Sequence, residues 1–529
     1  MDTDPGQVER ITFVGGGDAG LLTALALEEG LAGGQVTVVD DFEAPIPEVG
    51  KSTLSNVAAF LHDRLGIDTR RLWSEVELAW KTTVYFEDWC GVDPFHSPLG
   101  QTIPIVRKEN TRNDGDSPVL GLRPDHEDEF HEYYYRYEEG DFSSIYGEVA
   151  ETPGKAPILI NRDNGGASAR KALPSFSYHF DSRSLNEFLR SLCRERGIEL
   201  VNDRITDVTV TDGRIESITG EAAEYTADLY VDASGFKRLL IEELGTEFVE
   251  FDLPVDSAVV AKADIPVSEV VSATVVTSGD AGWFWQIDTF AGEDGHRDLG
   301  YVYSSAHLSD EAAREEFVDA RDENIDSEDT RTYRFESGVV AKPWRTNCVA
   351  VGNAVGFVEP LQSTALSAHC KTAVELTRAL AKHGRVNCKG VRRMYNETTR
   401  ATWEEAYDFI SIYYKYSSGD TPFWEDAREV NPGELDHYRT YQDSGFSGWQ
   451  ELAHLTRTGT DLNGYELYYI TFRNLGVEST CYEQLDLDVD PGIADYIESY
   501  TDSLPDRVAD FASYEELAST FPELLGNAQ

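Results

Sequence analysis

A glycine-rich segment near the start of the chain has the residue types that bind a dinucleotide phosphate. It runs Gly15-Gly16-Gly17-Asp18-Ala19-Gly20, between the apolar runs 11–14 and 21–27, and the acid Asp40 follows a further strand-like run at 35–39. Glycines allow a tight turn, a helix N-terminus favours the phosphate charge, and the acid takes a ribose hydroxyl. The pattern predicts a βαβ nucleotide-binding unit, and a glycine turn used only for helix–strand packing is the alternative. The predicted cofactor contacts are Gly15, Gly17, Ala19, Gly20 and Asp40.

A lysine in an aromatic stretch is the next candidate for chemistry. Lys81 follows Trp80 and precedes Phe86 and Trp89. Loss of water lowers the pKa of a lysine and makes its neutral amine accessible, whereas its charged form is a strong hydrogen-bond donor. Lys81 is therefore a candidate catalytic residue, and an ordinary lysine at the surface end of a strand is the alternative.

Two later segments also contain notable residues, a tryptophan pair and a run rich in glycine and turn residues. Trp283 and Trp285 are two positions apart, which places both on one face of a strand. Residues 352–364 begin with Gly-Asn-Ala and end with Pro-Leu-Gln-Ser-Thr. Taken alone, the tryptophans indicate a strand face packed into a core.

Together and in this order, the four segments resemble the flavin-dependent tryptophan halogenases. The match is densest in residues 11–56, 78–89, 178–308 and 333–428. The run Asp232-Ala233-Ser234-Gly235 also resembles a flavin contact of glutathione-reductase-type flavoproteins. The resemblance implies an α/β fold, with a discontinuous Rossmann-like FAD-binding module of the glutathione-reductase type, an interleaved substrate-side β-sheet and C-terminal helices.

The resemblance implies halogenation of an electron-rich aromatic small molecule, such as an indole or a tryptophan-like ring. Reduced FAD from a separate flavin reductase would use oxygen and chloride or bromide to make hypohalous acid, which Lys81 directs onto the ring. Trp283 and Trp285 would wall the flavin from the substrate. Further FAD contacts implied by the resemblance are Ser52, Ile205, Asn353, Gly356 and Leu366.

The last of these segments, residues 352–364, departs from the family pattern Pro-Leu-Glu-Ser-Thr-Gly. The backbone N–H groups of Thr364 and Ala365 are the expected halide donors, because a backbone donor requires no particular side chain unless the family glycine needs a positive φ. Gln362 stands where the family has a glutamate that faces the lysine. A glutamine is nearly isosteric and forms hydrogen bonds, but it is neutral and cannot act as a base.

Two other departures concern charge and turns. Lys51 replaces a family glutamate in a strap over the flavin, and Asp288 replaces the proline that follows the tryptophan pair. Lys51 is expected either to strengthen flavin binding or to face solvent without consequence. Two alternative functions stay open: a flavin-dependent monooxygenase or oxidoreductase on the same scaffold, and an FAD-binding protein that has lost halogenation, which Gln362 would explain.

The charge of the chain limits its partners. Among 529 residues, 45 basic and 96 acidic side chains give a net charge of −51, spread along the sequence, while 41% hydrophobic and 11% aromatic residues indicate a packed protein. Such self-repulsion is screened in molar salt, so a salt-adapted protein from a halophile is expected. Nucleic acid and anionic membrane surfaces, which require a basic face, are not expected partners.

The remaining features favour a cytoplasmic protein without a metal. The six cysteines form no Cys-x-x-Cys pair, the first ten residues are polar, and no apolar run is long enough to span a membrane. Aspartates alternate in residues 485–491, but the glycine and glutamate of a calcium loop are missing. A homodimer is left open.

The family resemblance divides the chain into interleaved parts. The predicted FAD-binding module comprises residues 8–85, 175–245 and 335–395, the substrate side 86–174 and 246–334, a helical part 396–475, and an acidic extension 476–529.

Overall fold

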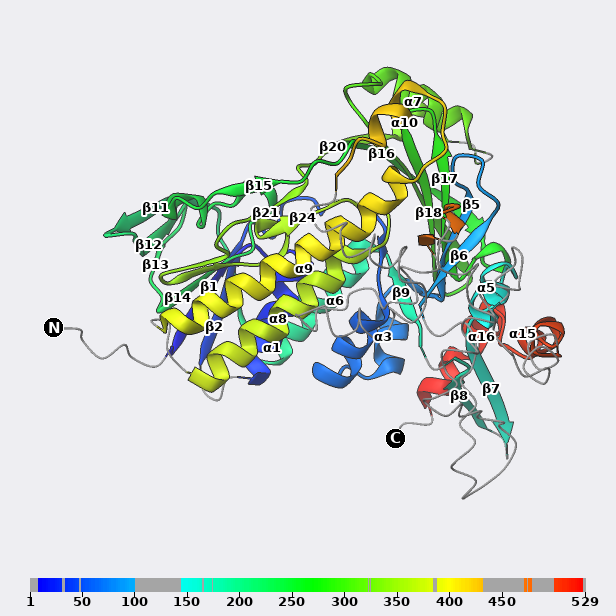
Figure 1. The fold of residues 1–529 in the computed structure, drawn as a ribbon. Coiled ribbons are helices and arrows are strands. Elements are labelled where there is room, and N and C mark those ends of the chain that lie inside the picture. The colour runs from blue at the N-terminus through cyan, green and yellow to red at the C-terminus, as the bar shows by residue number, and fades with distance from the viewer. Residues whose placement is uncertain are drawn as a thin grey trace, which may run out of the picture.

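The computed structural model places a helix-covered parallel sheet beside a larger, mostly antiparallel sheet (Figure 1). The structure describes residues 8–30, 34–46, 49–99, 144–163, 166–173, 175–321, 323, 325–383, 388–431, 471–472, 474–477 and 499–526. The run 485–491 singled out in the sequence lies outside these ranges.

Six described strands form the first sheet, and its inner strands are parallel. The predicted strands at residues 11–14 and 35–39 are confirmed as neighbours, with Phe13 beside Val38. In spatial order the strands are β10 (Glu199–Asn202), β2 (Gln35–Asp40), β1 (Arg10–Val14), β14 (Leu229–Asp232), β23 (Cys348–Ala350) and the antiparallel β22 (Trp344–Arg345).

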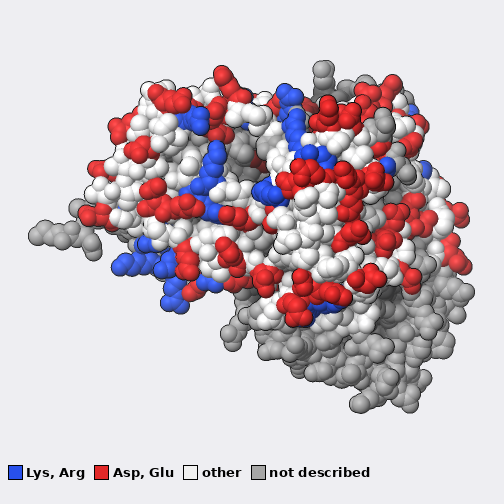
Figure 2. All heavy atoms as spheres, turned by 90° about the horizontal axis from the view of Figure 1, so that it is seen from above, with Lys and Arg blue, Asp and Glu red and all other residues white. Residues whose placement is uncertain are grey.

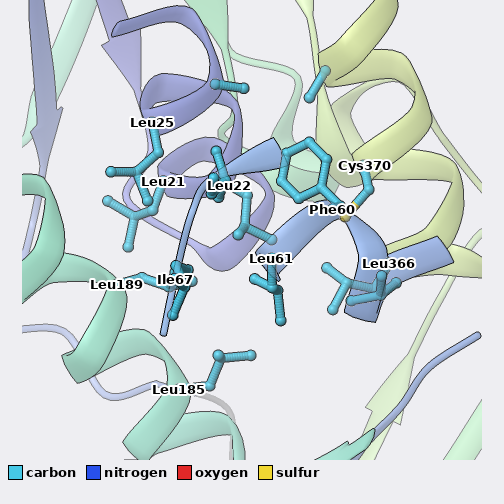
Figure 3. Close-up of a cluster of buried hydrophobic side chains, with 14 of the residues drawn as sticks. Leu21, Leu22, Leu25, Phe60, Leu61, Ile67, Leu185, Leu189, Leu366 and Cys370 are labelled. Carbon is cyan, nitrogen blue, oxygen red and sulfur yellow. The ribbon is translucent and has the colours of Figure 1, made fainter. Parts of the chain in front are cut away.

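Helices α1 (Asp18–Gly30), α6 (Ser182–Glu195), α8 (Thr364–His383) and α9 (Lys389–Lys415) cover this sheet. Nine residues of α1 are buried, so this helix is packed on all sides. Figure 3 shows leucines of α1 meeting side chains of α6, of α8 and of the turn around Phe60 and Ile67. The helix predicted at residues 21–27 is confirmed, and the apolar cluster fixes the glycine loop that precedes it.

The second sheet contains ten of the described strands. Its long central strands, β16, β19 and β18, are antiparallel, and β17 joins β18 to β5. The strands are β20 (Arg331–Arg334), β16 (Ser257–Pro266), β19 (Asp294–Tyr303), β18 (Gly282–Ala291), β17 (Ala273–Gly279), β5 (Thr83–Asp88) and β6 (Phe95–Pro98), with β3 (Lys51–Ser52), β4 (Leu78–Lys81) and β9 (Ser177–Phe180) off this path.

Three short strands join the nucleotide-binding segments to the second sheet. β9 pairs with both β3 and β4, which places Ser52 opposite His179 and Lys81 opposite Ser177. These strands come from segments assigned to the FAD module in the sequence, yet they belong to the sheet of the predicted substrate side. Lys81 therefore lies where the two parts of the fold meet.

Smaller elements surround these sheets. Near the C-terminus, α16 (Tyr514–Gly526) packs on the hairpin β7 (Ile158–Asp163) and β8 (Gly166–Lys171), and α15 (Leu504–Ala509) packs on α5 (Ile145–Ala150). The others are α2 (Ser55–Ala59), α3 (Thr69–Glu75), α7 (Asp310–Asp319), α10 (Pro422–Ala427), β11 (Ile205–Thr211), β12 (Arg214–Gly220), β13 (Glu224–Tyr225), β15 (Phe248–Glu250), β21 (Gly338–Val340) and β24 (Gly356–Phe357).

Acidic side chains are dispersed over the surface. Figure 2 shows Asp and Glu scattered across the face seen from above, with Lys and Arg in smaller groups between them. No helix within the described residues has both the length and the apolar character needed to cross a bilayer. The predicted α/β class, with a parallel nucleotide-binding sheet and an interleaved second sheet, is confirmed.

Candidate active site

The glycine loop between β1 and α1 has the shape that a dinucleotide requires. Gly15 has φ +111°, and a Cβ there would lie 2.2 Å from the carbonyl oxygen of Ala233. A Cβ at Gly20 would lie 2.5 Å from the Gly15 oxygen, so these two glycines allow strand and helix to approach. A Cβ at Gly17 meets nothing within 4 Å, which leaves open space beside the start of α1. The loop therefore fits a bound pyrophosphate.

The predicted ribose acid contacts this loop, and two other parts of the chain complete the cradle. The Asp40 carboxylate accepts a hydrogen bond of 2.7 Å from the Gly16 N–H. A Cβ at Gly352, after β23, would lie 2.8 Å from the Cβ of Ala19, so the turn after β23 reaches the loop. Ile205 begins β11, just beyond Asp203, whose N–H donates to the Asp40 carbonyl.

The other predicted FAD contacts, Asn353, Gly356 and Leu366, lie in different surroundings. Asn353 lies in the turn after β23 and its side chain contacts His369 at 3.3 Å, while Gly356 begins β24. Leu366 is different, because its side chain lies in the apolar cluster between α1 and α8 (Figure 3). Only the backbone of Leu366 is therefore left to contact a cofactor.

Replacement of Gly17 by alanine is expected to weaken FAD binding without destabilising the free protein. The added methyl group meets no protein atom, but it enters the space where a phosphate must approach the backbone. We expect the Kd for FAD, measured by quenching of flavin fluorescence, to rise about tenfold or more, the equivalent of one lost hydrogen bond to a charged group. Gly390→Ala, in the exposed first turn of α9, is the matched control, and equal affinities of both variants would contradict the assignment.

Lys81 is fully buried at the end of β4, and its exposed fraction is 0%. Its Nζ donates to the Ser363 Oγ at 2.9 Å. Among the described residues no carboxylate forms an ion pair with it, and burial lowers the pKa of Lys81 to about 7. At neutral pH the amine therefore exists in both its charged and its neutral form, which is unusual for a lysine.

A chain of hydroxyl groups continues from the Lys81 contact. The Ser363 hydroxyl donates to Ser52 at 2.7 Å, Ser52 contacts the Thr274 hydroxyl at 2.7 Å, and Thr274 lies 3.0 Å from the His179 Nε2. His179 is fully buried, and burial, with a smaller contribution from Lys81, lowers its pKa well below the ordinary value. Ser52 was expected to contact FAD, whereas the roles of Ser363, Thr274 and His179 were not anticipated.

The predicted halide donors lie at the start of a long helix. Thr364 and Ala365 are the first residues of α8, which has 20 residues, so their N–H groups have no partner within the helix. An exposed set of N–H groups at a helix start favours an anion. The left-handed residue of this turn is Ser363, with φ +58°, and not Ala365. The alanine in place of the family glycine is thus compatible with the backbone.

Gln362 is held in a buried polar pocket directly before this turn. Its Nε2 donates to the Tyr413 hydroxyl at 2.6 Å, and its Oε1 accepts from Ser97 at 3.5 Å. Tyr413, from α9, also contacts the Thr471 hydroxyl at 3.0 Å. Both hydroxyl groups around Gln362 can act as donors, so the pocket also suits a carboxylate.

Replacement of Gln362 by glutamate is expected to raise the pKa of Lys81, because a carboxylate next to Ser363 supplies the missing negative charge. An opposite charge within about 4–6 Å shifts a pKa by about 1 unit or more. The pH midpoint of halogenation should move upward from near 7 by that amount. Gln362→Met, which adds no charge, should leave the midpoint in place, and an unchanged midpoint in Gln362→Glu would contradict the electrostatic account.

Trp283 and Trp285 form one face of β18, as predicted, and are 1% and 5% exposed. The Trp283 Nε1 donates to the Tyr414 hydroxyl at 3.0 Å. Trp285 lies over Gly300, where a Cβ would come within 2.3 Å of the indole ring. Both tryptophans belong to the same large buried cluster as Leu361, in the turn before α8.

Glu359 does not take the place of the missing glutamate. It is fully buried on the side of the tryptophan wall, and burial raises its pKa to about 8, against smaller effects of Leu361, Trp283 and Tyr414. Its Oε1 accepts from the Leu361 N–H at 3.3 Å. Glu359 therefore stabilises the turn and does not face Lys81 as an anion.

Asp288 replaces the family proline without ending the strand. β18 continues to Ala291, and the carboxylate of Asp288 accepts two hydrogen bonds from Arg297 on β19, at 2.9 and 3.0 Å. The Val271 N–H donates to the same carboxylate. A buried ion pair thus fixes the strand where the family has a proline.

Comparisons with known proteins identify the family of this chain. The model of the tryptophan halogenase family matches residues 10–462. The 7-chloro-L-tryptophan 6-halogenase KtzR of Kutzneria sp. (strain 744) is 30% identical over 450 residues, 79% of this chain and 81% of that protein. Tryptophan 7-halogenase RebH of Lentzea aerocolonigenes is 27% identical, over 88% of this chain and 86% of RebH.

The fold is also that of a solved structure. BrvH, a flavin-dependent halogenase from Brevundimonas sp. BAL3, superposes with a TM-score of 0.77 at 24% sequence identity, covering 97% of this chain and 99% of BrvH. The resemblance inferred from the motifs is thereby confirmed. This chain is an enzyme that belongs to the tryptophan halogenase family of flavin-dependent halogenases.

Proposed function

We propose that this protein is an FAD-dependent halogenase in which Lys81 directs hypohalous acid onto an electron-rich aromatic substrate, an indole or a tryptophan-like ring. The observation that supports this most strongly is the position of the Lys81 amine. It is fully buried and bonded to Ser363, one residue before the N–H groups at the start of α8. A lysine with a structural role alone would be costly at such a depth.

Each group of site residues has a separate role in the proposed reaction. When bound, reduced FAD supplies the oxygen chemistry that converts halide into hypohalous acid. The N–H groups of Thr364 and Ala365 hold the halide. Trp283 and Trp285 separate the bound flavin from the aromatic substrate. Lys81 keeps N–H groups beyond the one given to Ser363, and these orient the oxygen of the hypohalous acid.

Transfer of the halogen from hypohalous acid to the ring requires no further reactant. The ring carbon forms a bond to the halogen as the oxygen–halogen bond breaks, and the ring proton leaves to give water. Gln362 cannot accept that proton, because an amide is not a useful base. It instead fixes the pocket through Tyr413 and Ser97.

The partners follow from this chemistry. The proposal includes a separate flavin reductase as partner and chloride or bromide as co-substrate. Within the chain, segments 8–85, 175–245 and 335–395 form the proposed FAD-binding module. Segments 86–174 and 246–334 form the substrate side, although the pairing of β4 with β18 connects both parts. The cytoplasm is the proposed compartment, and the free thiols of the described cysteines support it. Homodimerisation and salt adaptation remain predictions.

A panel of indoles and phenols tests the proposed function. The protein is incubated with FAD, a flavin reductase, NADH, oxygen and either halide, and the products are analysed by mass spectrometry. We expect a monohalogenated product from at least one compound. FAD binding and oxygen consumption without any halogenated product would instead support a protein that has lost halogenation.

A further inference from the structure

Lys51, which reverses the charge of the family residue in the flavin strap, has a specific partner in the nucleotide loop. Its Nζ lies 3.1 Å from the Asp18 carboxylate. Asp18 is the first residue of α1, so this ion pair joins the strap to the end of the helix that a pyrophosphate approaches. The next strap residue, Ser52, contacts Ser363 and Thr274.

Asp18 places an almost fully buried negative charge at the N-terminus of α1, the same place that would bind the anionic pyrophosphate. Its carboxyl group is 7% exposed, and its second oxygen accepts from the Asn186 Nδ2 at 2.8 Å. Asn186 is 2% exposed and also donates to the Gly16 carbonyl, and its Oδ1 has no partner. Without a cofactor, a carboxylate at a helix N-terminus is favourable. With a pyrophosphate nearby it is repulsive, and Asp40 adds a second acid on the ribose side.

Lys51 is the cation best able to offset this repulsion. Its side chain is 34% exposed, so it can change partner without leaving a buried charge behind. Arg190 is less free, because it stacks on the Phe42 ring and donates to the Phe42 carbonyl. His369 adds no charge near neutrality, since burial and the nearby Lys51 lower its pKa to about 3.

We propose that Lys51 and Asp18 form an exchangeable ion pair: Asp18 holds Lys51 in the free protein, and Lys51 transfers to the cofactor phosphates when FAD binds. Asp18 then keeps its hydrogen bond from Asn186. The pair makes FAD binding a competition between two anions for one cation. This inference rests on FAD binding, which is part of the proposed function.

The Kd for FAD distinguishes this role from a structural latch. Flavin fluorescence quenching is measured at several KCl concentrations for wild type, Lys51→Gln, Asp18→Asn and the double variant. We expect Lys51→Gln to raise the Kd about tenfold, the size of one charge-assisted hydrogen bond, and to flatten its salt dependence. Asp18→Asn should lower the Kd several-fold, because the competing anion is gone. Lys51→Arg should bind FAD like wild type.

The other outcomes overturn the proposal. An unchanged Kd in Lys51→Gln excludes Lys51 as the phosphate cation. Weaker binding in both single variants, with a lower melting temperature of the free protein, indicates a latch that only holds the strap. If wild type itself does not bind FAD, the proposed function and the ion-pair exchange are both wrong, whereas FAD binding by wild type with an unchanged Kd in Lys51→Gln overturns the exchange alone.

Discussion

Replacement of Lys81 by methionine abolishes halogenation, with a rate loss of about a thousand-fold or more, as expected when a group that acts on the reacting atoms is removed. Methionine has a similar length and no charge, so it suits a site with 0% exposure. Because burial already penalises the charged amine, the variant should fold at least as stably as wild type. FAD binding and flavin oxidation should persist, since Lys81 bonds to Ser363 and not to the glycine loop.

Lys262 provides the matched control on the same sheet. It lies on β16, is 34% exposed, and pairs with Glu77 and Asp181 at 3.1 Å each. Lys262→Met should retain halogenation within a few-fold in the same product assay. Retention of halogenation by Lys81→Met, at equal flavin turnover, would remove Lys81 from the mechanism.

Replacement of Arg297 by methionine is expected to cause the largest loss of stability, about 3–5 kcal/mol, because it leaves a buried carboxylate without its partner. The Asp288 side chain is 0% exposed and accepts two hydrogen bonds from the guanidinium. Arg297 also pairs with Glu323 at 2.9 Å. Denaturant unfolding monitored by tryptophan fluorescence measures the change in the free energy of unfolding.

Two controls distinguish loss of the ion pair from loss of packing as the cause of the lower stability. Burial raises the pKa of Asp288 above its ordinary value, and loss of the guanidinium raises it further. The stability deficit of Arg297→Met should therefore shrink as the pH falls through that raised pKa and the carboxyl group becomes neutral. Asp288→Asn in the Arg297→Met background should recover part of the loss. A deficit that does not depend on pH and is not relieved by Asp288→Asn would assign the effect to packing alone.

The parts predicted best from sequence are those that depend on neighbours in the chain. The glycine loop, its flanking strands and α1 follow from local hydrophobic periodicity and from glycines at fixed spacing. Lys81 and the tryptophan pair were placed by their motifs, and the structure puts them at the junction of the sheets and on one strand face.

Contacts between distant segments could not be predicted. Lys81 and Ser363 are 282 positions apart, and Thr274 and His179 meet the same hydroxyl chain only because β3, β4 and β9 belong to the second sheet. Spacing along the chain contains no signal for such a contact unless related sequences vary together.

The departures from the family pattern were visible in the sequence, but their consequences were not. Ala365 is harmless because the left-handed backbone lies at Ser363. Asp288 is tolerated because Arg297, on the next strand, neutralises it. Lys51 finds its partner in Asp18, which is 33 positions earlier. The explanations for Asp288 and Lys51 require the identity of a residue that the folded chain brings close, and that for Ala365 requires the backbone angle at Ser363.

The mass spectrum of the aromatic product formed under ¹⁸O₂, in bromide and with a flavin reductase, tests the central claim most directly. Transfer of hypohalous acid through Lys81 breaks the oxygen–halogen bond, so the product should show the isotope doublet of bromine and contain no ¹⁸O. Incorporation of ¹⁸O into the ring without bromine would instead identify a monooxygenase and contradict the halogenase account.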